Sequence, residues 1–102
     1  MEGQASIASD VLARYAADAA LEVEGVRGLV GGHLPRQRSV RIATGDDGRT
    51  SVELQLELEW GAAFAEVGRA VQDRVAGYLA RMAGAPPARV DVVVAEVGPV
   101  RG

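Results

Sequence analysis

The stretch that decides the fold of this chain is Val52-Glu53-Leu54-Gln55-Leu56-Glu57-Leu58-Glu59-Trp60. Apolar and polar residues alternate along its whole length without a break. Successive side chains of a strand leave on opposite faces, so the stretch is predicted to be a half-buried β-strand. The face from Val52 to Trp60 is expected to lie in the core, and the glutamate face is expected to stay in water.

Two long segments with a helical spacing of apolar residues lie on either side of this strand. The first covers residues 7–22 and the second covers residues 62–83. The apolar positions of the first are Ala8, Val11, Leu12, Tyr15, Ala16, Ala19 and Val23. Those of the second are Phe64, Val67, Val71, Val75, Tyr78, Leu79 and Met82. Both segments are therefore predicted to be amphipathic helices that bury one side in the core.

Residues with special backbone preferences predict where these helices begin and end. Either Ser6 or Ser9 is expected to cap the first helix, because a serine hydroxyl accepts a hydrogen bond from a free amide of the first turn. Gly25 follows the last periodic residue of this helix, where a left-handed C-cap needs glycine. Gly84 and the two prolines that follow it are expected to stop the second helix.

The polar turn 45–49 predicts a hairpin between a strand over residues 39–44 and the central strand. If Thr44 faces Thr50, Arg41 falls opposite Glu53 and Val40 falls opposite Leu54. Both pairs match in kind, since one joins opposite charges and the other joins apolar side chains. The hairpin register is therefore part of the prediction.

Residues 26–30 and 90–97 are predicted to supply a short strand and a final strand. The order is then helix, two strands, long strand, helix, strand. This order predicts an α+β fold of two layers, with two helices packed on one face of a small mixed sheet of three to four strands. The crossover after Trp60 is expected to be right-handed.

Length and composition indicate one domain spanning residues 1–102, with a core over about 7–97 and frayed residues 98–102. The chain has no cysteine, which excludes disulfides and a cysteine nucleophile. It has no apolar run near the ~20 residues that span a bilayer, and its start does not resemble a secretion signal. We therefore expect a cytoplasmic protein without direct membrane insertion, so any membrane association would come through a partner.

The sequence contains no recognisable catalytic or metal-binding set. Its only histidine is His33, and no serine is held near it by a recognisable turn. The segment Asp46-Asp47-Gly48 is much shorter than a calcium-binding loop and reads as a hairpin tip. General acid catalysis needs a carboxyl group in a cleft, and an open strand face offers none. The prediction is a protein that is not an enzyme and has no cofactor and no metal.

Two charged surfaces remain as candidate interaction sites. The acidic one comprises Glu53, Glu57 and Glu59 on the polar face of the central strand, and the arginine-bearing loop comprises Arg36, Arg38 and Arg41. The simplest interpretation of both is a solvated surface. The sharper hypothesis is that the opposite charges meet between copies of the chain, in a head-to-tail contact that forms a homo-oligomer.

The segment Gly25-Val26-Arg27-Gly28 supports an alternative function. Its G-x-x-G spacing occurs where KH domains clamp a nucleic-acid backbone. In that module the motif joins two helices in a basic setting, whereas here Glu22 and Glu24 precede it and the chain carries a net charge of −3. A nucleic-acid partner is therefore not favoured, and helix termination followed by a tight turn is the preferred interpretation.

Five short motifs, in the same order along the chain, resemble those of the alkaline shock protein family of bacterial envelope-stress-response proteins. They are Glu22-Val23-Glu24-Gly25-Val26, Trp60-Gly61, Val71-Gln72 with Val75, Met82-Ala83-Gly84 and Val90-Asp91-Val92-Val93-Val94. The resemblance covers about residues 7–97. The chain departs from the family pattern at Ala83 and Asp91, and it lacks both lysine and a long charged tail.

The resemblance implies a non-enzymatic cytoplasmic protein of cell-envelope homeostasis. It further implies self-association and docking to a small integral membrane anchoring protein. The residues that carry the motifs are expected to be structural, since glycines 25 and 61 would turn the chain and the valines would fill the core. The function predicted is that of a scaffold protein of the envelope stress response.

Overall fold

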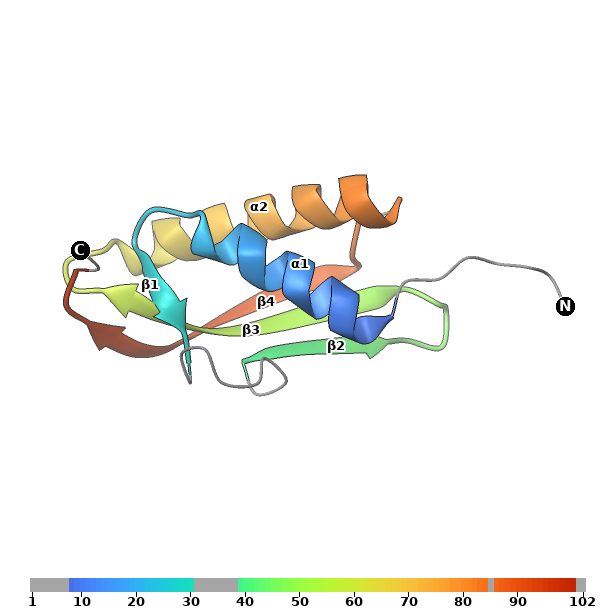
Figure 1. The fold of residues 1–102 in the computed structure, drawn as a ribbon, viewed down its shortest axis with the longest axis horizontal. Helices are drawn as coiled ribbons and strands as arrows, with labels where there is room; N and C mark the ends of the chain where they lie inside the picture. Colours follow the sequence, from blue (N-terminus) through green and yellow to red (C-terminus); the bar gives the residue numbers. More distant parts are fainter. Residues whose placement is uncertain (1–7, 31–38, 85, 101–102) are drawn as a thin grey trace, which may run out of the picture.

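The computed structural model describes residues 8–30, 39–84 and 86–100. The elements, in chain order, are α1 (Ser9–Leu21), β1 (Val26–Leu29), β2 (Val40–Thr44), β3 (Thr50–Glu59), α2 (Phe64–Ala83) and β4 (Arg89–Gly98). Both helices cover the same face of the sheet, and no helix of the described residues lies on the opposite face (Figure 1). The predicted two-layer α+β fold is therefore confirmed.

Strand β3 forms the centre of a mixed, four-stranded sheet. Strand β4 pairs with it in parallel over nearly its whole length, from Ser51↔Arg89 to Glu59↔Gly98. Strands β1 and β2 pair with it in antiparallel fashion at Leu56–Leu58 and Thr50–Leu54 respectively, so they share its other edge end to end. Gln55 lies between them, where its carbonyl accepts the Val30 amide at 3.1 Å and its amide donates to the Ser39 carbonyl at 2.8 Å.

The predicted hairpin register is confirmed. Arg41 pairs with Glu53, Val40 pairs with Leu54 and Thr44 pairs with Thr50. The turn between them closes with a hydrogen bond of 2.8 Å from the Gly45 amide to the Arg49 carbonyl. A one-residue slip would turn every leucine of β3 into water, so burial on one face holds this register in place.

The core combines large side chains from the sheet with small ones from α1. The apolar residues of β3 are completely or almost completely buried, namely Val52, Leu54, Leu56 and Leu58. The buried residues of α1 are all alanines, namely Ala16, Ala17, Ala19 and Ala20. Helix α2 contributes Val67, Val71, Val75 and Leu79. Alternating large and small residues across facing elements lets the two layers interdigitate at native packing density.

The helix limits agree with the predicted ones to within two residues, but one of the two serines offered as the N-cap of α1 is excluded. Helix α1 begins at Ser9 with Ala8 at the N-cap, and no described side chain caps it. The Ser9 cap is therefore wrong, and Ser6 lies outside the described residues. Gly25 has the predicted positive φ of 97°, but α1 has already ended at Glu22, so this glycine turns the chain into β1 instead.

Four large side chains predicted to face the core are exposed, namely Val11, Trp60, Phe64 and Met82. Val11 lies in the first turn of α1. Trp60 follows the last paired residue of β3 and lies in a turn, where the sheet no longer provides a layer to cover it. Phe64 and Met82 occupy the first and last turns of α2. The periodicity predicted the buried side of α2 correctly. Phe64 and Met82 lie at the two ends of this helix, where the neighbouring layer no longer covers their side chains.

Candidate interaction surface

The face of the sheet opposite the helices is open, and we call it the open face. Its residues on β3 are Ser51, Glu53, Gln55, Glu57 and Glu59, which alternate with the buried core residues. The strand registers add Arg41 and Ala43 from β2, and Arg89, Asp91, Val93 and Glu96 from β4. This surface carries charges of both signs across three adjacent strands.

Arg27 joins three segments of the chain at one end of the open face. The β1–β3 register shifts between Val26 and Gly28, so Arg27 is the extra residue of a β-bulge. Its Nη1 lies 2.9 Å from Glu57 Oε2, and its Nε donates to the Pro99 carbonyl at 2.9 Å. The arginine thereby links β1, the central strand and the segment that follows β4.

Gly98 makes room for this arrangement. A Cβ atom at this position would lie 2.9 Å from Arg27 Nε and 3.1 Å from Glu57 Oε2. Contacts this short force the neighbouring atoms to move, so a side chain at position 98 would displace the ion pair. Arg27 was predicted only as part of the G-x-x-G turn, because no local pattern in the sequence links it to Glu57 and Gly98.

Two further ion pairs of the open face are more exposed. Arg41 Nη1 lies 3.8 Å from Glu53 Oε1, and the two side chains are 69% and 38% exposed. Arg89 Nη2 lies 3.0 Å from Asp91 Oδ2 within β4. Exposed pairs of this kind contribute little to stability, since water screens them and holding two long side chains costs entropy. They are free to exchange partners when another molecule approaches.

A sequence profile of the alkaline shock protein 23 family, described as having cell envelope-related function, matches residues 1–99 of this chain. The chain belongs to this family. A solved structure of a MamM-CTD variant with a histidine-to-alanine substitution has the same fold, with a TM-score of 0.64 and 18% sequence identity. The match covers 93% of this chain and 100% of that one. Among curated protein sequences, no significant match was found.

In this alkaline shock protein 23 family member, the acidic residues that were predicted to form an interaction surface all lie on one face of the sheet. Glu53, Glu57 and Glu59 all lie on the open face, and Arg41 joins them there through its pair with Glu53. Arg36 and Arg38 lie outside the described residues, as does His33. The structure therefore brings together four of the six predicted interaction residues, and it adds Arg27 to them.

The Gly25–Gly28 turn has a structural explanation in this family member. Gly25 adopts a positive φ, and a Cβ atom there would lie 2.8 Å from Val67 Cγ2. Position 25 therefore needs glycine both for its backbone conformation and for its close approach to α2. Because Arg27 is already engaged by Glu57 and the Pro99 carbonyl, the turn does not present a free guanidinium to a phosphate.

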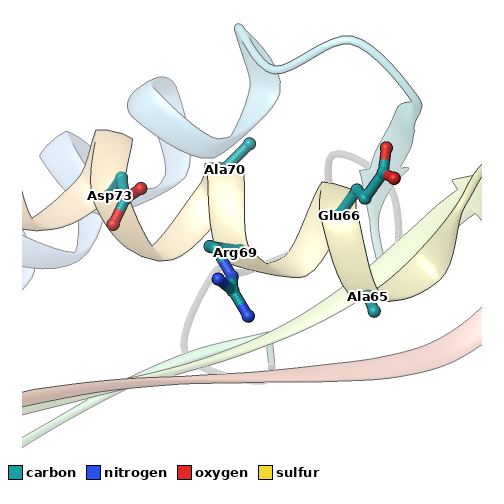
Figure 2. Close-up of a pocket in the computed structure, with 5 residues that line it drawn as sticks. All are labelled: Ala65, Glu66, Arg69, Ala70 and Asp73. Carbon is teal, nitrogen blue, oxygen red and sulfur yellow. The ribbon is translucent and has the colours of Figure 1, made fainter.

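The helical layer carries shallow hollows. One is lined by Ala65, Glu66, Arg69, Ala70 and Asp73, all from α2, and their side chains point in different directions around the helix (Figure 2). A hollow built from one helix has no second element to close over a small molecule. It therefore lacks the convergent polar groups that ligand pockets have.

A second hollow lies between the α1–β1 connection and α2, and it is lined by Glu22, Glu24, Glu66 and Arg74 among others. Arg74 Nη1 is 2.6 Å from Glu22 Oε1, which ties the end of α1 to α2. In residues 8–30, 39–84 and 86–100, no three metal-binding side chains lie close enough to share an ion. No helix in the same ranges has the length and apolarity needed to cross a bilayer.

The Arg27–Glu57 pair is expected to stabilise the fold measurably, whereas Arg41–Glu53 is not. The side chains of Arg27 and Glu57 are only 35% and 20% exposed, and Arg27 makes a second hydrogen bond. In a double-mutant cycle with alanine, the coupling energy in urea unfolding should be about 1 kcal/mol for this pair and below about 0.5 kcal/mol for Arg41–Glu53. Equal coupling energies for the two pairs would contradict the assigned role of Arg27.

Proposed function

We propose that this protein is a non-enzymatic scaffold of the envelope stress response, acting by self-association and by docking to a membrane-anchored partner. The observation that supports this most is the open face. The central strand presents Glu53, Glu57 and Glu59 on a surface that no helix covers, with arginines on the neighbouring strands. A broad, uncovered surface of both charges suits contact with other proteins.

Self-association would use the charged side chains that exchange their ion-pair partners most readily. The Arg41–Glu53 pair is long and exposed, so an arginine of another copy can compete for Glu53 at little cost. Glu57 is held more tightly by Arg27, so it serves the fold first. The head-to-tail contact that we propose therefore joins the acidic surface of Glu53, Glu57 and Glu59, with Glu53 at its centre, to Arg36, Arg38 and Arg41 of the next copy.

Glu53→Arg is expected to weaken self-association several-fold, because it places a positive charge opposite the arginines of the neighbouring copy. The change is best measured by light scattering against protein concentration, at low and at high salt. Salt should weaken the wild-type association and have less effect on the variant. Glu57→Arg is a poorer choice, since it also removes the partner of Arg27 and disturbs the sheet.

Asp18→Arg is the matched control for this experiment. Asp18 is exposed on α1, in the layer on the other side of the sheet, and the substitution changes the net charge by the same amount. If Asp18→Arg weakens self-association as much as Glu53→Arg does, net charge alone explains the result. Association that is indifferent to salt and to both variants would exclude the charge contact.

Docking to a membrane-anchored partner needs a separate measurement. Tagged protein should retain an integral membrane protein when it is incubated with detergent-solubilised membranes of its native host. The same bait without solubilised membranes provides the background. Retention of nucleic acid and of no membrane protein would favour the alternative nucleic-acid function over the scaffold.

A further inference from the structure

Large apolar side chains are exposed together at one end of the molecule, which we call the apolar end. They are Trp60, Phe64, Val97 and Val100, and Trp60 is 63% exposed. The other exposed large apolar side chains of the described residues are dispersed, with Val11 on α1, Met82 at the far end of α2 and Val93 on the open face. Single exposed apolar residues are ordinary on a surface, but a group that includes two aromatic residues marks an interaction site.

Backbone geometry brings the apolar end together. The Trp60 amide donates to the Gly98 carbonyl at 2.8 Å, and Val97 pairs with Leu58. Gly61, with a φ of 85°, turns the chain, so that Phe64 starts α2 beside this point. In Figure 1 the ends of β3 and β4 and the start of α2 all lie at the same end of the molecule.

Carboxylates flank this apolar end, and two of them, Glu59 and Glu96, lie on the adjoining edge of the open face. Glu59 precedes Trp60, Glu66 lies in the first turn of α2, and Glu96 precedes Val97. Glu24 is exposed nearby and lines the same hollow as Glu66. Of the basic residues here, Arg27 is occupied by Glu57 and the Pro99 carbonyl, and Arg69 lies one turn further along α2. The surface is therefore apolar in its centre and acidic at its border.

We propose that the apolar end binds a peptide segment that is both basic and apolar, supplied by the membrane-anchored partner. Aromatic residues dominate the energetic centres of interfaces, and an acidic border attracts lysine and arginine. The cytoplasmic flanks of membrane-spanning helices have this composition, since they are enriched in basic residues. An anionic lipid surface fits less well, because the carboxylates would be repelled by it. The inference rests on the proposed docking function and names the surface that performs it.

Trp60 is the only tryptophan of the chain and therefore reports directly on this surface. The probe is a synthetic amphipathic peptide of leucine and lysine without aromatic residues. Titration of this peptide should shift the emission of Trp60 to shorter wavelength, because docking removes the indole from water. A leucine–glutamate peptide and a serine–lysine peptide of equal length should leave the emission unchanged, since each lacks one of the two required properties.

Matched substitutions test the location of the site. Phe64→Ser should weaken binding of the leucine–lysine peptide about tenfold, which is typical of a central aromatic side chain. Val97→Ser should weaken it several-fold, and Val93→Ser should change it less than twofold. Val97 and Val93 are both 39% exposed and both lie in β4, but only Val97 belongs to the apolar end. Far-ultraviolet circular dichroism checks that each variant is folded.

The outcomes separate this inference from the proposed function. If the membrane partner is retained in the pull-down but Phe64→Ser and Val97→Ser retain it equally well, the inference is wrong and the scaffold function stands. If no membrane protein is retained, the docking function itself fails. A shift of Trp60 emission with anionic vesicles but not with the peptide would assign the surface to lipid. A shift with protein concentration alone would assign it to a second copy, and either result overturns the proposal.

Discussion

Replacing Leu56 with alanine is expected to lower the free energy of unfolding by about 2–5 kcal/mol. Leu56 is completely buried in the middle of the central strand, opposite Leu29 of β1 and Val94 of β4. The fully buried residues of α1 are all alanines, and side chains this short cannot fill the cavity that the substitution leaves. Urea unfolding followed by circular dichroism should show a lower midpoint with an unchanged slope.

Gln55→Ala is the matched control for this substitution. Gln55 is the preceding residue of the same strand, and its side chain lies on the open face. Its backbone bonds to Val30 and Ser39 do not depend on its side chain, so the change in stability should stay within about 0.5 kcal/mol. A comparable loss at both positions would show that strand propensity, and not the core, governs the stability of β3.

Gly25→Ala is expected to be the second most damaging change, lowering the free energy of unfolding by about 2–4 kcal/mol. Two effects add here. An alanine at a positive φ of 97° is strained by about 1–2 kcal/mol, and its Cβ atom would lie 2.8 Å from Val67 Cγ2. Val67 is part of the buried face of α2, so it cannot move aside without disturbing the core.

Gly48→Ala separates these two effects. Gly48 also has a positive φ, of 81°, but a Cβ atom there meets nothing within 4 Å. The free energy of unfolding of Gly48→Ala should therefore fall by the cost of backbone strain alone, about 1 kcal/mol. The double variant Gly25→Ala/Val67→Ala should lose less free energy of unfolding than the two single variants lose together. The reason is that Val67→Ala removes the side chain that the new Cβ atom would meet. Strict additivity would contradict the predicted clash.

The two surfaces proposed for interaction differ in chemistry, and they adjoin at Glu59 and Glu96. The open face carries paired charges and suits contacts that salt weakens. The apolar end carries aromatic side chains at the junction of β3, α2 and β4. A scaffold that binds another copy of itself and a membrane-anchored partner needs a surface for each. A single surface could hold only one of the two at a time.

Several elements could be predicted from sequence because their signals are local. The alternation along β3 has a period of two, and the core residues of α2 follow a period close to 3.6, so neither depends on distant residues. The hairpin register followed from a short turn and from matched pairs such as Arg41 and Glu53. The acidic residues of the open face were predicted by the same alternation.

Other features depended on which elements meet, and no local pattern carries that information. Periodicity placed Trp60 on the core side, but the end of the sheet leaves it exposed. Ala17 and Ala20 were absent from the predicted apolar face of α1, yet both are fully buried, because α1 packs against α2 as well as the sheet. The T-shaped contact between Tyr15 and Tyr78, with ring centroids 5.8 Å apart, marks this second interface.

By itself the sequence determined the elements, the hairpin register and the wet face of the central strand, since each arises from the backbone geometry of neighbouring residues. Only the tertiary structure decided that Arg27 reaches Glu57 and, 72 residues away, the Pro99 carbonyl. It also decided that Trp60, Phe64 and Val97 share one end of the molecule. Both juxtapositions require three chain segments to be placed at once, and the position of each segment depends on the packing of the whole core.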